Sequence, residues 1–164
     1  PAFFHTHRDN AEDQDMLSRR SFDVNMRLFK YCVNYRSIIL AICGHLVAAC
    51  ETKRPGRKRA KGVSGPNRGF PFRIIAYNCD SPLGPMVLIN PVITKRYGEI
   101  KKVSTTCGAI KGGPIIVERA EFIDYEFNDT TGMRQYRHNV GKDQHGFTIQ
   151  HEIDHCDGKL ITDE

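Results

Sequence analysis

The sequence predicts a mixed α and β domain, with helices toward its two ends and strands between them. Three observations lead to this prediction: a helical apolar pattern over residues 22–50, strand-like segments from residue 72 onward, and a second helical pattern over residues 146–157. The 164 residues also have the length of one ordinary domain. We therefore expect residues 1–164 to fold as a single domain around one core.

Two segments carry the apolar spacing of a helix. In residues 22–50 an apolar side chain recurs every three or four positions, and no proline interrupts the pattern before Pro55. This predicts one long helix, or two helices with a break near Asn34. In residues 146–157 the apolar positions follow i, i+4 and i+7, and Gly158 stands where a helix commonly ends. We expect this second helix to close the domain.

The middle of the chain has the pattern of strands. Residues 72–79 and 86–89 are rich in β-branched and aromatic side chains and are bounded by Pro or Gly. Residues 123–127 alternate apolar with acidic side chains, residues 128–132 supply turn chemistry, and residues 136–140 alternate again. The last three segments predict a half-buried β-hairpin.

The net charge is modest and concentrated in one place. The chain has 24 basic and 19 acidic residues, a net charge of +5, and much of the excess lies in residues 53–61. We expect an exposed basic insertion at about residues 52–61, in the simplest case a solvated loop. Contact with nucleic acid or with the ribosome, and a targeting patch, are the alternatives. The lack of interleaved aromatic rings weakens the nucleic-acid reading.

Several classes of protein are disfavoured. The six cysteines show no dense, regular framework, so reduced thiols are expected rather than disulfides. The longest apolar run, 38–50, has 13 positions and contains His45, which is too short to span a bilayer. Residues 1–15 lack the apolar core of a secretory signal, although a transit segment removed upstream stays open.

The segment that carries chemistry lies in the second helix. Residues 151–155 read His-Glu-Ile-Asp-His, a match to H-E-x-x-H. On a helix, His151 and His155 lie on one face, where both imidazoles can reach one metal ion at about 2.1 Å. Glu152 can stand beside a coordinated water. The alternatives are chance spacing on a surface helix and histidines satisfied by core hydrogen bonds, but the apolar face of this helix favours a metal site.

The sequence after the motif offers no third ligand. A histidine six residues after the second one would indicate a metzincin-like enzyme, but that position is Ile161. Only nine residues follow His155, too few for a later helix that carries a glutamate ligand. The ligand is therefore expected upstream, and Cys107 stands out because three glycines follow it within six residues. A single cysteine is otherwise more often a small buried hydrophobe.

With these residues, the sequence resembles the peptide deformylase family over roughly residues 60–160. The family binds its metal on a helix of the form Q-H-E-x-D-H-x-x-G, which residues 150–158 match. Its cysteine ligand lies in an E-G-C-L-S segment, and Thr-Thr-Cys-Gly-Ala at residues 105–109 keeps the cysteine alone. Its first motif, G-x-G-x-A-A-x-Q, aligns with residues 60–67.

The resemblance implies a peptide deformylase-like α+β fold, with antiparallel strands around the metal-binding helix, and hydrolysis of the N-formyl group from initiator methionine. It implies one divalent ion, Fe(II) or Zn(II), held by Cys107, His151 and His155 with an open position for water. Glu152 would transfer the proton. Two further side chains of the helix, Gln150 and Asp154, would support the ligands. For Asp154, an ordinary position on the helix surface is the alternative.

The resemblance also assigns residues to the substrate. The formyl oxygen would lie between the side-chain amide of Asn67, where the family has the longer glutamine, and the backbone N–H of Gly108. Lys61 replaces an apolar family residue, and Phe147 stands where the family has a smaller residue or arginine, which predicts a narrower methionine pocket. The remaining expected substrate contacts are Gly62, Thr105 and Thr106.

Two functions of different class follow. The first is metal-dependent deformylation of N-formylated peptide ends. The alternative is a divergent deformylase-like protein that keeps the metal site but binds a peptide or partner with little or altered hydrolysis. We expect no membrane partner and no secretion, with a cytoplasmic location in a bacterium or a mitochondrial or plastid location in a eukaryote.

Overall fold

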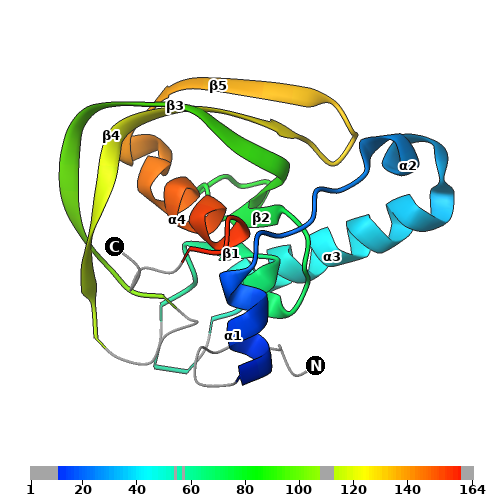
Figure 1. The fold of residues 1–164 in the computed structure, drawn as a ribbon, viewed down its shortest axis with the longest axis horizontal. Helices are drawn as coiled ribbons and strands as arrows, with labels where there is room; N and C mark the ends of the chain where they lie inside the picture. Colours follow the sequence, from blue (N-terminus) through cyan, green and yellow to red (C-terminus); the bar gives the residue numbers. More distant parts are fainter. Residues whose placement is uncertain (1–10, 54, 57, 108–112, 160–164) are drawn as a thin grey trace.

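The fold is built on one antiparallel sheet with helices on both faces of its short strands (Figure 1). The computed structural model describes residues 11–53, 55–56, 58–107 and 113–159. The elements are α1 Ala11–Ser18, α2 Met26–Tyr31, α3 Val33–Glu51, β1 Gly62–Ser64, the 3₁₀ turn η1 Pro66–Arg68, β2 Ile74–Tyr77, β3 Met86–Thr105, β4 Ile115–Asn128, β5 Arg134–Val140, the 3₁₀ turn η2 Lys142–Gln144 and α4 Gly146–Cys156. This is the α+β arrangement that the sequence predicts.

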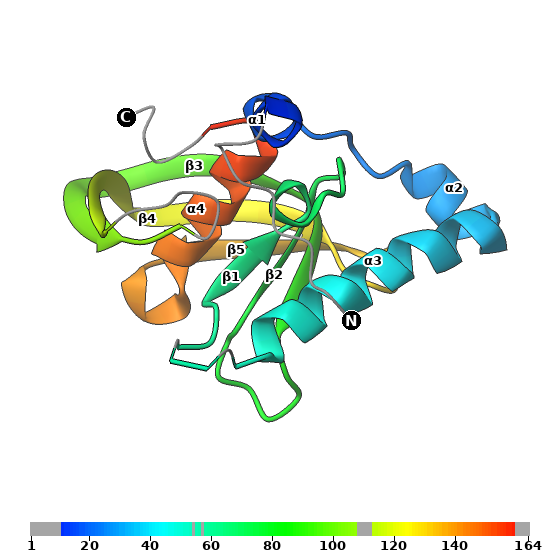
Figure 2. The ribbon, with the colours of Figure 1, turned by 90° about the horizontal axis from the view of Figure 1, so that it is seen from below.

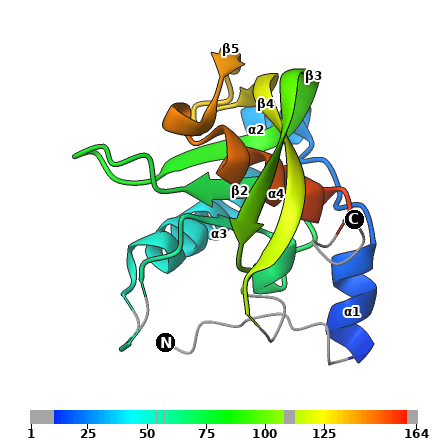
Figure 3. The same ribbon diagram turned by 90° about the vertical axis from the view of Figure 1, so that its left-hand side faces the viewer.

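The sheet has the strand order β1-β2-β3-β4-β5, with each strand antiparallel to its neighbours. Its two long strands, β3 and β4, curve around α4, as Figure 3 shows from the side. The register between them shifts at three places, and such shifts bend and twist a strand pair. This curvature lets one sheet cover the helix that carries the H-E-x-x-H segment.

Strand β2 divides the core into two parts because successive side chains of a strand point to opposite faces. Ile74 and Ala76 pack toward α3, in a cluster with Phe29 and Leu46. The alternate residues of the strand, Ile75 and Tyr77, pack toward α4. They belong to the second cluster, with Leu88, Phe127, Ile149 and Ile153. Figure 2 shows α3 and α4 on the two sides of β1 and β2. The core therefore fixes α4 against the sheet along its whole apolar face.

The N-terminal helical segment is two helices, which is the second of the two predicted possibilities. The break lies at Cys32, whose backbone is extended, two residues before the predicted position. The first helix begins at Met26 rather than Phe22, because Asn25 caps it and Phe22 instead pairs with Phe72 in an isolated bridge. The apolar spacing that predicts the helix includes Phe22, but the backbone at Phe22 is extended rather than helical.

Among the described residues, α3 is the one helix that is long and apolar enough to cross a bilayer by length and composition. Its mean hydropathy is 1.5, and 33% of the apolar window is buried inside the protein. The helix is longer than the apolar run at residues 38–50, because the helix also includes polar residues before that run, such as Arg36 and Ser37. The buried side packs against β1 and β2.

The strands extend further than the sequence predicts. The segment expected at 86–89 continues as β3 to Thr105, past Pro91 and Gly98, which resembled strand ends. Both residues lie at register shifts, where a strand tolerates a missing N–H or a positive φ. The predicted hairpin is present as β4 and β5. The described residues of the basic insertion are exposed except Ala60, which is half-buried.

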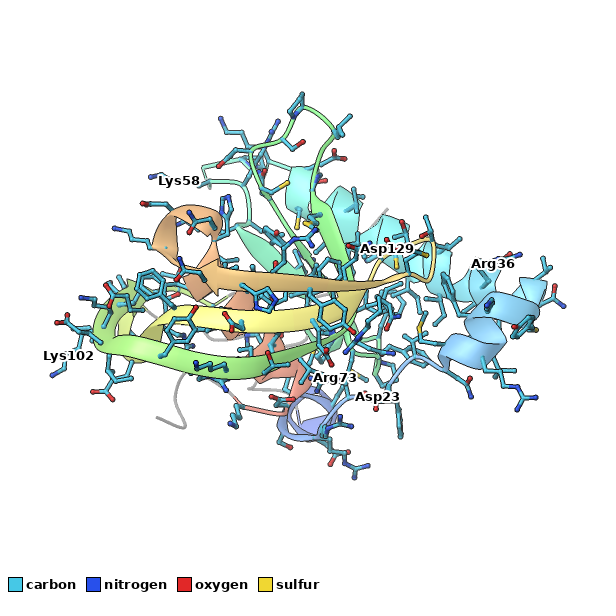
Figure 4. All side chains as sticks on the ribbon, turned by 90° about the horizontal axis from the view of Figure 1, so that it is seen from above. Asp23, Arg36, Lys58, Arg73, Lys102 and Asp129 are labelled. Atoms are coloured by element: carbon cyan, nitrogen blue, oxygen red, sulfur yellow. The ribbon has the colours of Figure 1, made fainter. Side chains whose placement is uncertain are left out.

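A buried arginine ties the C-terminal end of α4 to the sheet. The guanidinium of Arg73 donates hydrogen bonds to the backbone oxygens of Cys156, at 3.1 Å, and Pro91, at 2.9 Å, and forms an ion pair with Asp157. A longer ion pair, 3.5 Å, joins it to Asp23, and Figure 4 shows these two side chains together. Because its donors connect three segments, Arg73 holds the end of α4 in place.

Candidate metal centre

Helix α4 enters the core through a tight turn that only glycine fits. A Cβ on Gly146 would lie 2.8 Å from the backbone oxygens of Val140 and Gly141, which is closer than carbon and oxygen approach. His145, just before it, has a left-handed backbone with a φ of 65°. The turn brings α4 under β3 and β4, where eight of its eleven residues are buried. His155 therefore lies inside the protein, and His151 is half-buried.

Three side chains that bind metals converge at this point. The Nε2 atoms of His151 and His155 are 3.2 Å apart, and the Sγ atom of Cys107, just after β3, lies 3.2 Å from Nε2 of His155. All three donor atoms lie within 4.8 Å of one another. Ligands at 2.0–2.3 Å from one tetrahedral ion are roughly 3.3–3.6 Å apart. The described residues thus form a compact donor set that fits one small divalent ion.

The environment keeps both imidazoles in the neutral form that binds metals. Burial, with a smaller contribution from the charge of Arg119, lowers the pKa of His151 to about 4. Burial, followed by the charges of His151 and Arg119, lowers the pKa of His155 well below its ordinary value. Since a protonated imidazole has no lone pair to donate, these shifts preserve the ligands at neutral pH.

Glu152 is buried beside the histidines. Burial raises its pKa from an ordinary value of 4.5 to about 8, and the charge of Asp154 adds to the rise. The charge of Arg68 and the hydroxyl of Ser64 act in the opposite direction. With that pKa the carboxyl group of the metal-free chain is mostly protonated at neutral pH. Glu152 is therefore a buried group that can hold a proton next to the histidines, as a residue that transfers protons must.

Behind the histidines, Asp154 forms a buried ion pair with Arg119 from β4. The Oδ2 atom of Asp154 lies 3.0 Å from Nη1 of Arg119, and both residues are buried. Arg96 lies 3.9 Å from the other carboxylate oxygen. These three residues line a cavity of about 520 Å³ on the side of α4 that faces β3 and β4. Asp154 is therefore held in the interior rather than at the surface, which was the alternative expected for it.

Gln150 joins α4 to the sheet. Its side-chain amide donates to the backbone oxygen of Ala120 at 2.9 Å, and its oxygen accepts from the backbone N–H of Ala120 at 3.0 Å. The side chain thus completes the hydrogen bonding of β4 as a neighbouring strand would. This double contact sets the distance between α4 and β4, next to Arg119.

The structure places one of the two expected oxyanion donors. Asn67 lies in η1, the turn after β1, which contacts α4. Its side-chain oxygen is buried and has no hydrogen-bond partner among the residues that the structure describes. Gly108, the second expected donor, lies outside the described residues.

The expected substrate residues differ in how far they are buried and in how close they lie to α4. Gly62, in the edge strand β1, lies directly against the helix, since a Cβ there would come within 2.8 Å of Glu152 Cγ and Thr148 Cγ2. Phe147, in the first turn of α4, is half-buried. The others flank the strands: Lys61 is exposed before β1, Thr105 is half-buried at the end of β3, and Thr106 is exposed after it.

Two functional neighbours were not found from the sequence. Arg119 occupies an inward position of β4, two residues after the buried Val117. The signal in the sequence was therefore a cation at a strand position that the alternation assigns to the core. Arg68 is buried next to Asn67 in η1 and acts on Glu152. Nothing in the spacing around Arg68 distinguishes it from a surface arginine.

Fold and site together define a class of protein: an α+β domain with a mononuclear Cys-His-His donor set and a glutamate on an H-E-x-x-H helix. The sequence model of the polypeptide deformylase family matches residues 18–164. The chain therefore belongs to the polypeptide deformylase family, as the motifs predicted.

Individual relatives agree. The chain is 37% identical over 83 residues to a peptide deformylase of Chloroflexus aurantiacus, which covers 51% of this chain and 44% of that protein. It is 36% identical over 103 residues to a peptide deformylase of Dictyoglomus thermophilum, covering 62% and 63%. The match thus spans 44% of the length of the first of these curated relatives and 63% of the length of the second.

Solved structures share the fold. The Thermotoga maritima peptide deformylase superposes with a TM-score of 0.73 at 21% identity, covering 100% of this chain and 97% of that one. The Acinetobacter baumannii enzyme with Met-Ala-Ser bound has a TM-score of 0.78 at 19% identity, covering 99% and 98%. At these identities the likeness establishes the fold.

Proposed function

We propose that this chain is a metal-dependent hydrolase that removes the N-formyl group from the initiator methionine of new polypeptides. One observation carries the proposal: the donor atoms of Cys107 and His151 each lie 3.2 Å from Nε2 of His155, and the buried Glu152 directly follows His151. Membership of the polypeptide deformylase family, and the Met-Ala-Ser bound by the Acinetobacter relative, support this substrate class.

The donor set suits a single divalent cation with an open fourth position. When bound there, such an ion supplies a Lewis acid that lowers the pKa of a coordinated water to about 7. A thiolate with two imidazoles is compatible with Fe(II) and with Zn(II), so we propose one ion of either kind per chain. The neutral imidazoles of His151 and His155 are ready to bind without releasing a proton at pH 7.

Glu152 would perform both proton transfers. It accepts the proton as water attacks the formyl carbon and then passes a proton to the leaving amine. The product pair is formate and a free α-amino group. Close packing against Gly62 restricts the Glu152 side chain, which favours one position of its carboxylate. Arg119 and Asp154 would keep α4 and its histidines at a constant distance from β4.

Asn67 would donate its side-chain N–H to the developing oxyanion. Its amide lies in the turn that contacts α4, and its oxygen is buried. The second donor in this proposal is the backbone N–H of Gly108. Loss of one donor of this type typically reduces turnover by about 10²–10³-fold.

The test is formate release from formyl-Met-Ala-Ser by the chain loaded anaerobically with Fe(II), and in parallel with Zn(II). We expect multiple turnover with at least one metal, and a fall of about 10²–10⁴-fold in Glu152→Ala with metal content retained. Absence of formate from a fully loaded, folded chain that still binds Met-Ala-Ser would instead support the alternative, a deformylase-like protein that binds peptide ends without efficient turnover.

Contact with the ribosome is a further part of this proposal. The exposed cations around residues 53–59, outside the sheet, are its sole support in the structure. Co-sedimentation with ribosomes, compared between the parent chain and a Lys53→Gln, Lys58→Gln variant, tests it. Equal sedimentation of the two chains would remove this surface from consideration.

A further inference from the structure

From Val33 to Gly44 the fully exposed positions of α3 carry no charge, which is unusual for a helix that contacts water. Its buried side is formed by residues such as Ile39, Ile42 and Leu46. Between Val33 and Gly44 the exposed positions are all apolar, small or uncharged, namely Val33, Asn34, Ser37, Ile38, Leu40, Ala41 and Gly44, while Arg36 is half-buried and the last residue of the helix, Glu51, is exposed. A surface helix ordinarily places charged residues opposite its apolar stripe. The solvent side of α3 between Val33 and Gly44 therefore has the composition of a surface that a partner covers.

Helix α2 extends this surface. Tyr31 is 74% exposed, Val33 63% and Ile38 59%, and Leu28 and Leu40 are exposed as well. Figures 1 and 2 show α2 and the first half of α3 projecting beyond the sheet. We call these residues, together with the nearby cations Arg27, Lys30 and Arg36, the α2–α3 tip. Large apolar side chains gathered on a projection commonly mark a binding surface.

The charges at the tip have one sign. Arg27, Lys30 and Arg36 lie between Met26 and Cys50, and this range contains no acidic residue. The ammonium of Lys30 lies over the Tyr31 ring, 5.3 Å from its centre. Asp129, in the β4–β5 turn, accepts hydrogen bonds from that turn and from Gln135 of β5. The tip thus combines apolar side chains with three cations that form no ion pair with the residues that the structure describes.

This combination favours one partner over two others. In a symmetric dimer through the tip, the same patch meets itself, and positive charges would face positive charges. A nucleic acid would use the cations but would leave Val33, Ile38 and Leu40 without a contact. An anionic lipid surface supplies counter-charge for the cations and an apolar layer for these side chains.

Contrary to the expectation from the sequence, we propose that the α2–α3 tip binds the surface of membranes that contain anionic lipids. The chain would lie on the membrane rather than cross it, because the other side of α3 belongs to the core of the domain. Tyr31 and Ile38 would enter the interface, and Arg27, Lys30 and Arg36 would pair with lipid headgroups. This proposal is independent of the catalytic activity, since none of these residues is a metal ligand.

The test is co-sedimentation of the full chain with vesicles of phosphatidylcholine alone and of phosphatidylcholine mixed equally with phosphatidylglycerol. We expect binding to the mixed vesicles that weakens as salt is raised. Each cation near an anionic surface contributes roughly a fivefold change in affinity, so Arg27→Gln, Lys30→Gln, Arg36→Gln should reduce it by about a hundredfold. Tyr31→Ser, Ile38→Ser should also reduce it.

Matched controls lie at the other side of the molecule. Lys102→Gln changes an exposed cation at the opposite end in Figure 4, and Leu83→Ser changes a side chain that is 95% exposed in the β2–β3 loop. Both should bind vesicles as the parent does. Circular dichroism and metal content confirm that each variant is folded.

Three results would overturn the proposal. One is no binding to mixed vesicles at low salt. Another is binding that RNA displaces and that Tyr31→Ser, Ile38→Ser leaves unchanged, which would make the tip a polyanion site. The third is a concentration-dependent dimer, measured by sedimentation velocity, that the same double variant abolishes while vesicle binding is absent.

Discussion

At the scale of single residues, the site depends on groups whose ionisation is set by burial. Glu152 shows this most clearly, because its pKa of about 8 exceeds the 4.5 of the unfolded chain. Between these values the folded protein holds a proton that the unfolded chain has lost. Stability therefore falls as pH rises through this window.

We expect Glu152→Gln to stabilise the metal-free protein above pH 8 by a few kcal/mol, since each pKa unit corresponds to about 1.4 kcal/mol. Below about pH 4.5 the two proteins should be equally stable, because the glutamate is then neutral in both states. Urea unfolding in the presence of a chelator, repeated across pH, measures the difference. A difference that does not depend on pH would show that Glu152 is not buried as described.

A second residue-level prediction concerns Asn67. It is one methylene shorter than the glutamine of the family, so we expect Asn67→Gln to raise kcat or leave it unchanged. Formate release and metal content are measured together. If the longer side chain abolished turnover with metal retained, η1 would already hold Asn67 at the right distance.

The motif residues could be predicted because their chemistry is local. His151, Glu152 and His155 lie within one and a half turns of helix, so spacing alone places the two histidines on one face and Glu152 about 100° around the helix from His151. Arg119 could not be found in this way, because its partner Asp154 is 35 positions away in the sequence and the contact depends on the register of β4. A contact between residues so far apart depends on how the strands pair in the folded sheet, and the spacing of residues in the sequence does not show that pairing.

At the scale of elements, β1 and α4 act as one unit. Gly62 separates them, and a Cβ there would lie 2.8 Å from Glu152 Cγ. The segment 90–105 of β3 escaped prediction for a related reason: Pro91 and Gly98 resemble strand ends when the partner strand, and with it the register shifts, is unknown. The helices were easier to predict because their apolar period is intrinsic to the segment.

We expect Gly62→Ala to destabilise the protein by about 1–3 kcal/mol through overpacking, and to lower kcat more than metal content by displacing Glu152. Gly44→Ala is the matched control. A Cβ on Gly44 meets nothing within 4 Å, and alanine favours a helix over glycine by roughly 1 kcal/mol. Thermal unfolding and formate release compare the two. Equal stability of Gly62→Ala and the parent would mean that β1 and α4 have room to separate.

At the scale of the whole molecule, one curved sheet serves two purposes. Its long strands β3 and β4 enclose α4, and Cys107, just after β3, and Arg119, in β4, both meet the helix from the end where these two strands connect. Its short strands carry α3, and the α2–α3 tip contains none of the metal-binding residues. The catalytic proposal and the membrane proposal therefore use separate parts of the fold and can be tested apart.

The most direct test of the metal centre is X-ray absorption at the zinc edge of the Zn(II)-loaded chain. The donor set predicts one ion per chain, with one sulfur at about 2.3 Å and two imidazole nitrogens at about 2.0–2.1 Å. Cys107→Ser should lose the sulfur signal and bind zinc more weakly. A first shell of nitrogen and oxygen alone in the parent chain, or zinc bound as tightly by Cys107→Ser, would contradict the assignment of Cys107, His151 and His155 as the metal ligands.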